Sequence, residues 1–195
     1  MSISDIHITN PYQECIFIYG MRGSGKTELM KYLLKQYDLR GIKTYVFDTL
    51  HQYKIKLKNG KIIKPSFAMK QAIFEKVCCY LWNKGNYVFF IEEIDQFCNP
   101  RWLPSYLDSL VQLGRNRNIS VIATSRRVAE VHSTIVANCE HHFIFKAFLP
   151  RDLEYYQRYV GKIVWEALNL PKYHFIYYRV GENPMICKPI KPIEG

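Results

Sequence analysis

The sequence predicts an α/β fold in which a mainly parallel central sheet is flanked by helices. Between residues 14 and 145, short apolar runs alternate with segments of helical periodicity. The first apolar run ends in a glycine-rich loop, and polar residues follow later runs, where open α/β sheets place functional groups. At 195 residues the chain has the length of one domain, with a core at about 14–145 and a helical, then strand-rich, extension at 146–195.

The first expected strand, Cys15 to Tyr19, leads into the pattern G-x-x-x-x-G-K-T, which is the P-loop or Walker A signature. Its glycines let backbone N–H groups point into one concavity ahead of a helix, and such a nest binds polyphosphate. Lys26 would reach the β- and γ-phosphates, and the Thr27 hydroxyl would hold Mg²⁺. The expected nucleotide-binding residues are Gly20, Met21, Arg22, Gly23, Ser24, Gly25, Lys26 and Thr27.

Further elements follow in regular order. Helical periodicity predicts helices at 28–37, 67–82, 102–114, 128–136 and 150–160. Apolar and β-branched runs predict strands at 44–47, 87–91, 119–124, 142–145, 173–180 and 185–187. Asp48 is a candidate functional residue because it stands at the carboxyl end of the strand 44–47.

Residues 53–64 alternate apolar and basic side chains around Asn59-Gly60. Asn-Gly is the strongest short hairpin signal, so we expect a small β-hairpin insertion here. It would carry Lys54, Lys56, Lys58, Lys61 and Lys64. Two interpretations of these lysines stay open: protection of a solvated edge ribbon, or a basic finger that contacts a nucleic-acid backbone.

The strand 87–91 ends in Glu92 and Glu93, and an apolar run before paired carboxylates is the Walker B pattern. Glu92 would bind Mg²⁺ directly or through water, and Glu93 would polarise the attacking water as general base. The alternative is a solvated acidic turn, and Asp95 is the reserve candidate if the register is shifted. Adjacent carboxylates after a buried strand are costly without a cation, which favours the metal interpretation.

The net charge is +10, from 27 Lys and Arg against 17 Asp and Glu. This excess favours a polyanionic partner, nucleic acid first and a membrane surface second, although a basic chain can also simply be soluble. No apolar stretch approaches the roughly 18 residues of a membrane span. Residues 1–10 lack the pattern of a secretory signal, so we expect an intracellular protein.

Together these motifs resemble the FtsK–HerA superfamily of P-loop DNA-pumping ATPases. Residues 20–27 match the Walker A motif, and residues 48–53 resemble the D-x-x-x-E-Y segment, with Gln52 at the usual Glu. Residues 89–93 resemble the Walker B motif, with Glu92 at the usual Asp. Residues 114–126 resemble the G-R-x-x-G…T-Q-R segment, with Ile119 near the usual Gly and Ser125 at the usual Gln.

The resemblance implies a RecA-like (ASCE) P-loop NTPase fold and a ring-forming, usually hexameric, motor that translocates double-stranded DNA. It implies that Arg115 is the arginine finger reaching a neighbouring subunit's γ-phosphate, with Lys26 and Glu93 as the other catalytic residues. Arg117, Arg126 and Arg127 are the alternative arginines, and Ser125 would be a polar sensor of the γ-phosphate.

In size the chain resembles the genome-packaging ATPases of membrane-containing icosahedral viruses, especially those of archaea. This resemblance implies ATP and Mg²⁺, double-stranded DNA, a homo-oligomeric ring in the host cytoplasm or the virion, and capsid or membrane components at a portal vertex. The alternatives are a cellular or plasmid HerA-like ATPase for DNA repair or conjugation, a P-loop small-molecule kinase, and a non-catalytic nucleotide-regulated module. A kinase lacks a catalytic Glu after Walker B, so the pair Glu92-Glu93 argues against it.

Overall fold

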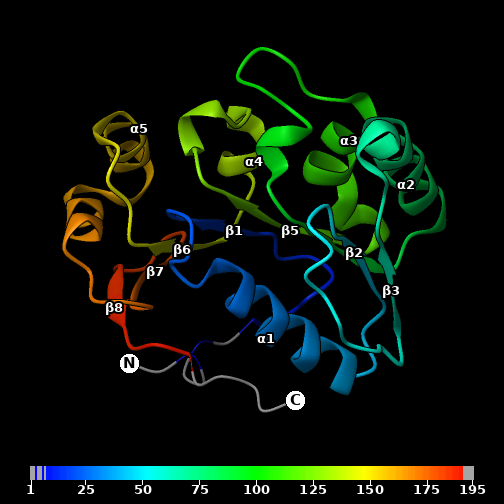
Figure 1. The fold of residues 1–195 in the computed structure, drawn as a ribbon, viewed down its shortest axis with the longest axis horizontal. Coiled ribbons are helices and arrows are strands. Elements are labelled where there is room, and N and C mark those ends of the chain that lie inside the picture. The colour runs from blue at the N-terminus through cyan, green and yellow to red at the C-terminus, as the bar shows by residue number, and fades with distance from the viewer. Residues whose placement is uncertain (1–2, 4–5, 7, 191–195) are drawn as a thin grey trace.

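The computed structural model describes residues 3, 6 and 8–190, which form one eight-stranded sheet with helices on both faces (Figure 1). The strands are β1 (Ile16–Tyr19), β2 (Thr44–Phe47), β3 (Gly60–Ile63), β4 (Tyr87–Ile91), β5 (Ile119–Ser125), β6 (His141–Phe145), β7 (Phe175–Arg179) and β8 (Met185–Cys187). The α-helices are α1 (Lys26–Leu39), α2 (Lys70–Lys84), α3 (Ser105–Leu113), α4 (Ser133–Ala137) and α5 (Pro150–Val160). The 3₁₀ helices are η2 (Phe67–Met69), η3 (Ile94–Gln96), η4 (Gly114–Arg117), η5 (Val128–Glu130) and η6 (Lys162–Leu168).

The strand order is β3-β2-β4-β5-β1-β6-β7-β8. From β3 to β6 all neighbours pair in parallel, whereas β7 runs antiparallel to both β6 and β8. The apolar runs of β1, β4 and β5 are buried on both faces, as expected for the centre of a parallel sheet. The predicted α/β fold with a mainly parallel sheet is confirmed, and it aligns the carboxyl ends of the central strands at one edge.

The helices divide the core into two layers (Figure 1). Helix α1 covers one face, where Ile16 and Ile18 of β1 join its apolar residues in one cluster. Helices α2, α3, α4 and α5 cover the other face, to which Phe17 and Tyr19 of β1 contribute. This alternation along β1 is the two-residue period of a strand, and it anchors the loop after Tyr19 between the two layers.

The expected hairpin at residues 53–64 is not formed, and that part of the prediction was wrong. Only Gly60–Ile63 is a strand, and it pairs in parallel with β2 at the edge of the sheet. The Asp38 carboxylate, near the end of α1, accepts the backbone N–H groups of Lys58 at 3.0 Å and Asn59 at 2.7 Å. A Cβ at Gly60 would collide with Thr44. Close approach to β2, rather than a hairpin turn, therefore explains the glycine.

Other differences concern element ends, one divided helix and additional 3₁₀ helices. Residues 67–69 form η2 ahead of α2, α3 begins at Ser105 instead of 102, and the expected helix at 128–136 divides into η5 and α4. No local pattern indicates η6. Residues 191–195 of the expected extension lie outside the described residues. In the described part of the chain, no helix has the length and apolar character needed to cross a bilayer.

Candidate active site

A cavity of about 510 Å³ opens at the carboxyl ends of the neighbouring strands β4, β5 and β1. Its lining brings together residues that are far apart in the sequence. Lys26 and Thr27 come from the start of α1, Glu92 and Glu93 follow β4, and Arg126 follows β5. The two motifs predicted to act together therefore line the same cavity.

The loop between β1 and α1 is shaped by close packing under it. Gly25 caps α1 at φ 118°, in the region that favours glycine, and an added Cβ would lie 3.0 Å from Cε1 of Phe145. The first N–H groups of a helix have no intrahelical acceptor and lie at the positive end of its dipole. The start of α1 thus offers unpaired donors to an anion in the cavity.

The Lys26 ammonium is held inside this loop. Its Nζ donates to the carbonyl oxygens of Gly20 at 2.7 Å and Met21 at 3.0 Å. Burial lowers the pKa of Lys26 to about 8, an effect that nearby Glu92 partly opposes. Ser24 Oγ is also buried, with no hydrogen-bond partner in the described part of the chain. A desolvated cation and an unpartnered hydroxyl fit a polyphosphate, which would compensate both.

Glu92 is buried and carries three hydroxyl contacts. Tyr53 donates to Oε1 at 2.7 Å, Thr124 donates to Oε2 at 3.2 Å, and the Thr27 hydroxyl also bonds to this carboxylate. Burial raises the pKa of Glu92, and these hydrogen bonds oppose the rise. Carboxylate and hydroxyl oxygens side by side are ligands that Mg²⁺ accepts, so Glu92 and Thr27 fit the predicted metal.

Glu93 lies in a strained backbone conformation that places its carboxylate in the cavity. Its φ of 52° and ψ of 60° are left-handed, which costs a residue with a side chain about 1–3 kcal/mol. Its N–H donates to Thr124 Oγ1 at 2.9 Å. Its carboxylate pairs with Arg126 at 2.8 Å and accepts from Gln96 Nε2 at 2.5 Å. The surrounding contacts thus hold Glu93 where backbone preference alone would not.

Two candidates have structural roles outside the cavity. Asp48 is fully buried and accepts the N–H groups of Gln52 and Tyr53, both at 3.0 Å, so it folds the loop that delivers Tyr53 to Glu92. Ser125 is also fully buried, and its Oγ accepts the N–H of Arg127 at 2.9 Å. On β5, Thr124 contacts Glu92 and Glu93, whereas Ser125 is hydrogen-bonded to Asp95.

The remaining candidates are separated by the fold. Asp95 lines a neighbouring cavity, which it shares with Arg126 and Arg127. Arg127 pairs with Asp152 at 3.2 Å and with Glu130 at 3.4 Å. Neither Asp95 nor Arg127 lies with Lys26 in the cavity of about 510 Å³ described above.

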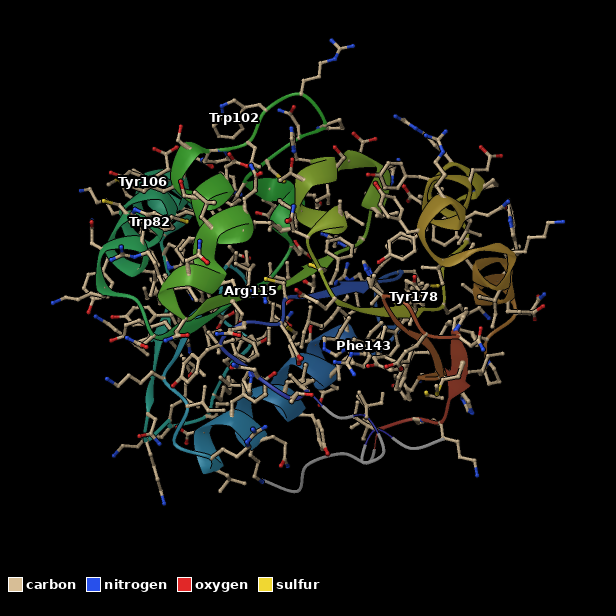
Figure 2. All side chains as sticks on the ribbon, turned by 180° about the vertical axis from the view of Figure 1, so that it is seen from behind. Trp82, Trp102, Tyr106, Arg115, Phe143 and Tyr178 are labelled. Carbon is tan, nitrogen blue, oxygen red and sulfur yellow. The ribbon has the colours of Figure 1, made fainter. Side chains whose placement is uncertain are left out.

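Arg115 and Arg117 lie on η4, at the amino end of β5. Arg117 donates to the carbonyl of Asn83 at 3.1 Å and lies 5.1 Å from the ring centroid of Trp82. Arg115, labelled in Figure 2, is exposed. Because β5 spans seven residues, η4 lies about 20 Å from the edge that holds the cavity. Arg115 therefore cannot reach the cavity of its own chain.

Sequence reasoning missed three residues that position the two carboxylates: Tyr53, Gln96 and Thr124. Gln96 follows Glu93 by three residues, a spacing that brings side chains together on a helical turn. Thr124 is a polar residue at the end of a buried strand, where α/β sheets place functional groups. Tyr53 is the last residue of the D-x-x-x-E-Y segment, but that pattern assigns it no role, because the path of the loop after β2 decides where its side chain points.

A family model matches the sequence of this chain, and solved structures share its fold. The family described as "AAA domain" matches residues 12–147. No curated protein matches the sequence.

Among solved structures, the genome packaging NTPase B204 from Sulfolobus turreted icosahedral virus 2, in complex with ATP-gammaS, has a TM-score of 0.80 and 20% identity, covering 94% of this chain and 100% of that one. The DNA-packaging ATPase B204 from Sulfolobus Turreted Icosahedral Virus has a TM-score of 0.76 and 17% identity over the same shares. The conjugation coupling protein TcpA of pCW3 has a TM-score of 0.67 and 16% identity, covering 90% of this chain and 60% of that one. At these identities the likeness shows the fold, and the predicted P-loop NTPase fold is confirmed.

Proposed function

The chain belongs to the AAA domain family through residues 12–147, and from this premise we propose that it is an ATP-hydrolysing motor that translocates double-stranded DNA. The observation that carries the proposal is the pair Glu92-Glu93 facing Lys26 and Thr27 across one cavity. A nucleotide-binding module needs the loop alone, whereas hydrolysis also needs a base beside the phosphates. The family supports the predicted ATPase activity.

Each residue of the cavity has a role in this reaction. Lys26 would neutralise the β- and γ-phosphates, and Thr27 and Glu92 would hold Mg²⁺. When bound, the metal supplies charge that stabilises the transferring phosphoryl group. Glu93 orients the attacking water and accepts its proton as the new bond from the water oxygen to the γ-phosphorus forms; the bond from that phosphorus to the β–γ bridging oxygen breaks, and ADP leaves with this oxygen. Arg126, which pairs with Glu93 at 2.8 Å, is placed to restrain that carboxylate.

The site is completed by a neighbouring copy. Arg115 is exposed and lies too far from its own cavity, so we assign it to the γ-phosphate of an adjacent subunit in a ring. Arg117 and Arg127 are weaker candidates, because each is engaged by groups of its own chain. A hexamer is the expected ring.

Double-stranded DNA is the proposed polyanion. The net charge is +10, and the lysines of residues 54–64 are exposed along the edge strand β3 and the segment before it. The likeness to B204, described as a genome packaging NTPase, favours a viral packaging motor in the host cytoplasm, acting at a portal vertex with capsid or membrane components.

A second candidate is a plasmid or cellular ATPase for conjugation or DNA repair. The fold similarity to TcpA, described as a conjugation coupling protein, favours it. Both candidates use the same cavity and the same DNA substrate. Adjacent genes for a capsid protein support packaging, whereas adjacent transfer genes support conjugation.

The test is ATP hydrolysis by the purified protein with and without linear duplex DNA. We expect duplex DNA to stimulate phosphate release several-fold, single strands to stimulate it less, and Lys26→Ala to abolish it. A triplex-displacement assay on the same DNA then measures translocation. If the protein hydrolyses ATP but neither binds duplex DNA nor is stimulated by it, the proposed motor is contradicted. Transfer of phosphate to a nucleoside instead of water would favour the kinase alternative.

A further inference from the structure

Tyr173 lines the active-site cavity from a part of the chain outside both nucleotide motifs. It stands in the turn between η6 and β7, and its side chain is 43% exposed. Its φ is 66°, a left-handed value that is rare for a bulky residue. A backbone conformation this unfavourable for an aromatic residue indicates that contacts of the Tyr173 ring hold the residue in place.

The ring lies directly beside the start of α1. A Cβ built on Gly25 would be 3.3 Å from Cδ1 of Tyr173. The Lys172 ammonium lies 4.8 Å from the ring centroid, over one face. The ring therefore lies next to Gly25 with a cation over one face, and it remains partly exposed where it lines the cavity.

We propose that Tyr173 is the platform on which the base of the bound nucleotide stacks. The phosphate end of the cavity is fixed by Lys26 and the carboxylates Glu92 and Glu93. The base must lie beyond the start of α1, and there Tyr173 is the single aromatic side chain lining the cavity within the described part of the chain. This role rests on the proposed ATPase, because Tyr173 supplies the second half of that site.

Stacking also defines the class of base. Every nucleobase offers a π-face, so a tyrosine platform is tolerant, and a purine covers more of the ring than a pyrimidine. The expected ligands are purine nucleoside triphosphates, with CTP and UTP bound more weakly. Lys172, held over the other face, strengthens the platform by restraining the ring.

The experiment compares ATP with inorganic tripolyphosphate, which has the phosphates but no base. Equilibrium binding with Mg²⁺ is measured by calorimetry for the wild type, Tyr173→Ala and Tyr173→Phe. We expect Tyr173→Ala to weaken ATP binding about 10-fold and to leave tripolyphosphate binding unchanged. The ratio of the affinities for ATP and CTP should become smaller in this variant. Tyr173→Phe keeps the ring and binds as the wild type does.

Tyr106→Ala is the matched control, since Tyr106 on α3 is also 43% exposed but does not line the cavity. Thermal unfolding of each variant checks the fold. A Tyr173→Ala protein that loses ATP and tripolyphosphate equally would overturn the proposal, because the ring then only supports the loop. Unchanged ATP affinity would overturn it as well. If the wild type binds neither ligand, the proposed ATPase itself fails.

Discussion

The phenolic oxygen of Tyr53 lies 2.7 Å from Oε1 of Glu92, although 39 residues separate them in the chain. Asp48 makes this contact possible, because its carboxylate accepts the N–H groups of Gln52 and Tyr53 and so turns the loop toward β4. The donor is uncharged, and burial raises the pKa of the tyrosine hydroxyl, so it stays protonated. Tyr53 therefore fixes the orientation of the carboxylate without adding a charge to the site.

Tyr53→Phe removes this hydrogen bond and keeps the ring. Groups that orient a metal ligand are typically worth 10–100-fold in metal affinity. We expect the Mg²⁺ concentration for half-maximal ATP hydrolysis to rise about 10-fold, measured by Mg²⁺ titration at saturating ATP. Tyr12→Phe is the control, since it loses a hydrogen bond to the Lys43 N–H away from the cavity. An unchanged Mg²⁺ requirement would show that Tyr53 only packs.

Nucleotide affinity should depend on pH through Lys26. Burial lowers the pKa of Lys26 from 10.5 to about 8 in the free protein. A bound polyphosphate stabilises the ammonium and raises that pKa, so the complex holds its proton more firmly than the free protein does. Affinity is therefore full below about pH 8 and falls as the pH rises above it, by up to about 10-fold per pH unit.

Calorimetric titration of ATP between about pH 7 and pH 9.5 measures this effect. Lys26→Arg is the control, because an arginine stays charged throughout this range. It should give an affinity that does not vary with pH, whatever its absolute value. Equal pH dependence in both proteins would assign the effect to another group.

Glu93→Gln tests the general base. The substitution keeps the size of the side chain and removes the proton acceptor, so the turnover number should fall about 10²–10⁴-fold. ATP binding should remain, since Lys26 and the loop are untouched. Phosphate release and nucleotide binding are measured on the same preparation, with Glu75→Gln, on the exposed surface of α2, as the control. A turnover number within a few-fold of the wild-type value would show that another residue is the general base.

Arg115 is tested by mixing subunits. An arginine finger contributes about 10³–10⁵-fold to the rate, so Arg115→Ala and Lys26→Ala proteins should each be inactive alone. In a mixture, an intact loop of one protein meets the intact Arg115 of the other, and part of the ATPase activity should return. Arg117→Ala, which removes interactions with Asn83 and Trp82 within its own chain, should keep its activity. No recovery on mixing would contradict action between subunits.

The edge lysines are tested through salt. A plot of log affinity for duplex DNA against log salt concentration has a negative slope. Replacing Lys56 and Lys58 by Gln should make this slope less steep, by about 0.9 for each phosphate that the protein no longer neutralises. Filter binding at several salt concentrations gives the slope. Lys76→Gln on α2 is the control. If the slope does not change, the lysines protect the edge of the sheet and do not contact DNA.

Local sequence patterns predicted most of the sheet, because β2, β4 and β8 are continuous strand-like runs whose bounds match the structure. The hairpin prediction was wrong because Asn59 and Gly60 contact residues that are distant in the sequence. Asn59 donates its N–H to Asp38, and Gly60 packs closely against Thr44, and no local pattern contains either contact. The same limit applies to the site. The motifs predicted Lys26, Glu92 and Glu93 in one place, whereas the paths of loops bring Tyr53 to Glu92 and Tyr173 to the cavity.

The positions of Arg115 and the cavity give the molecule a polarity. The cavity lies at the carboxyl ends of the strands, whereas Arg115, the proposed finger, lies at the amino end of β5. If Arg115 acts on a neighbouring copy as proposed, head-to-tail contacts would place the cavity of each copy against Arg115 of the next. Such heterologous contacts close only as a ring, and otherwise extend without end. On the proposed assignment of Arg115, each catalytic centre would be complete only where a neighbouring copy is present.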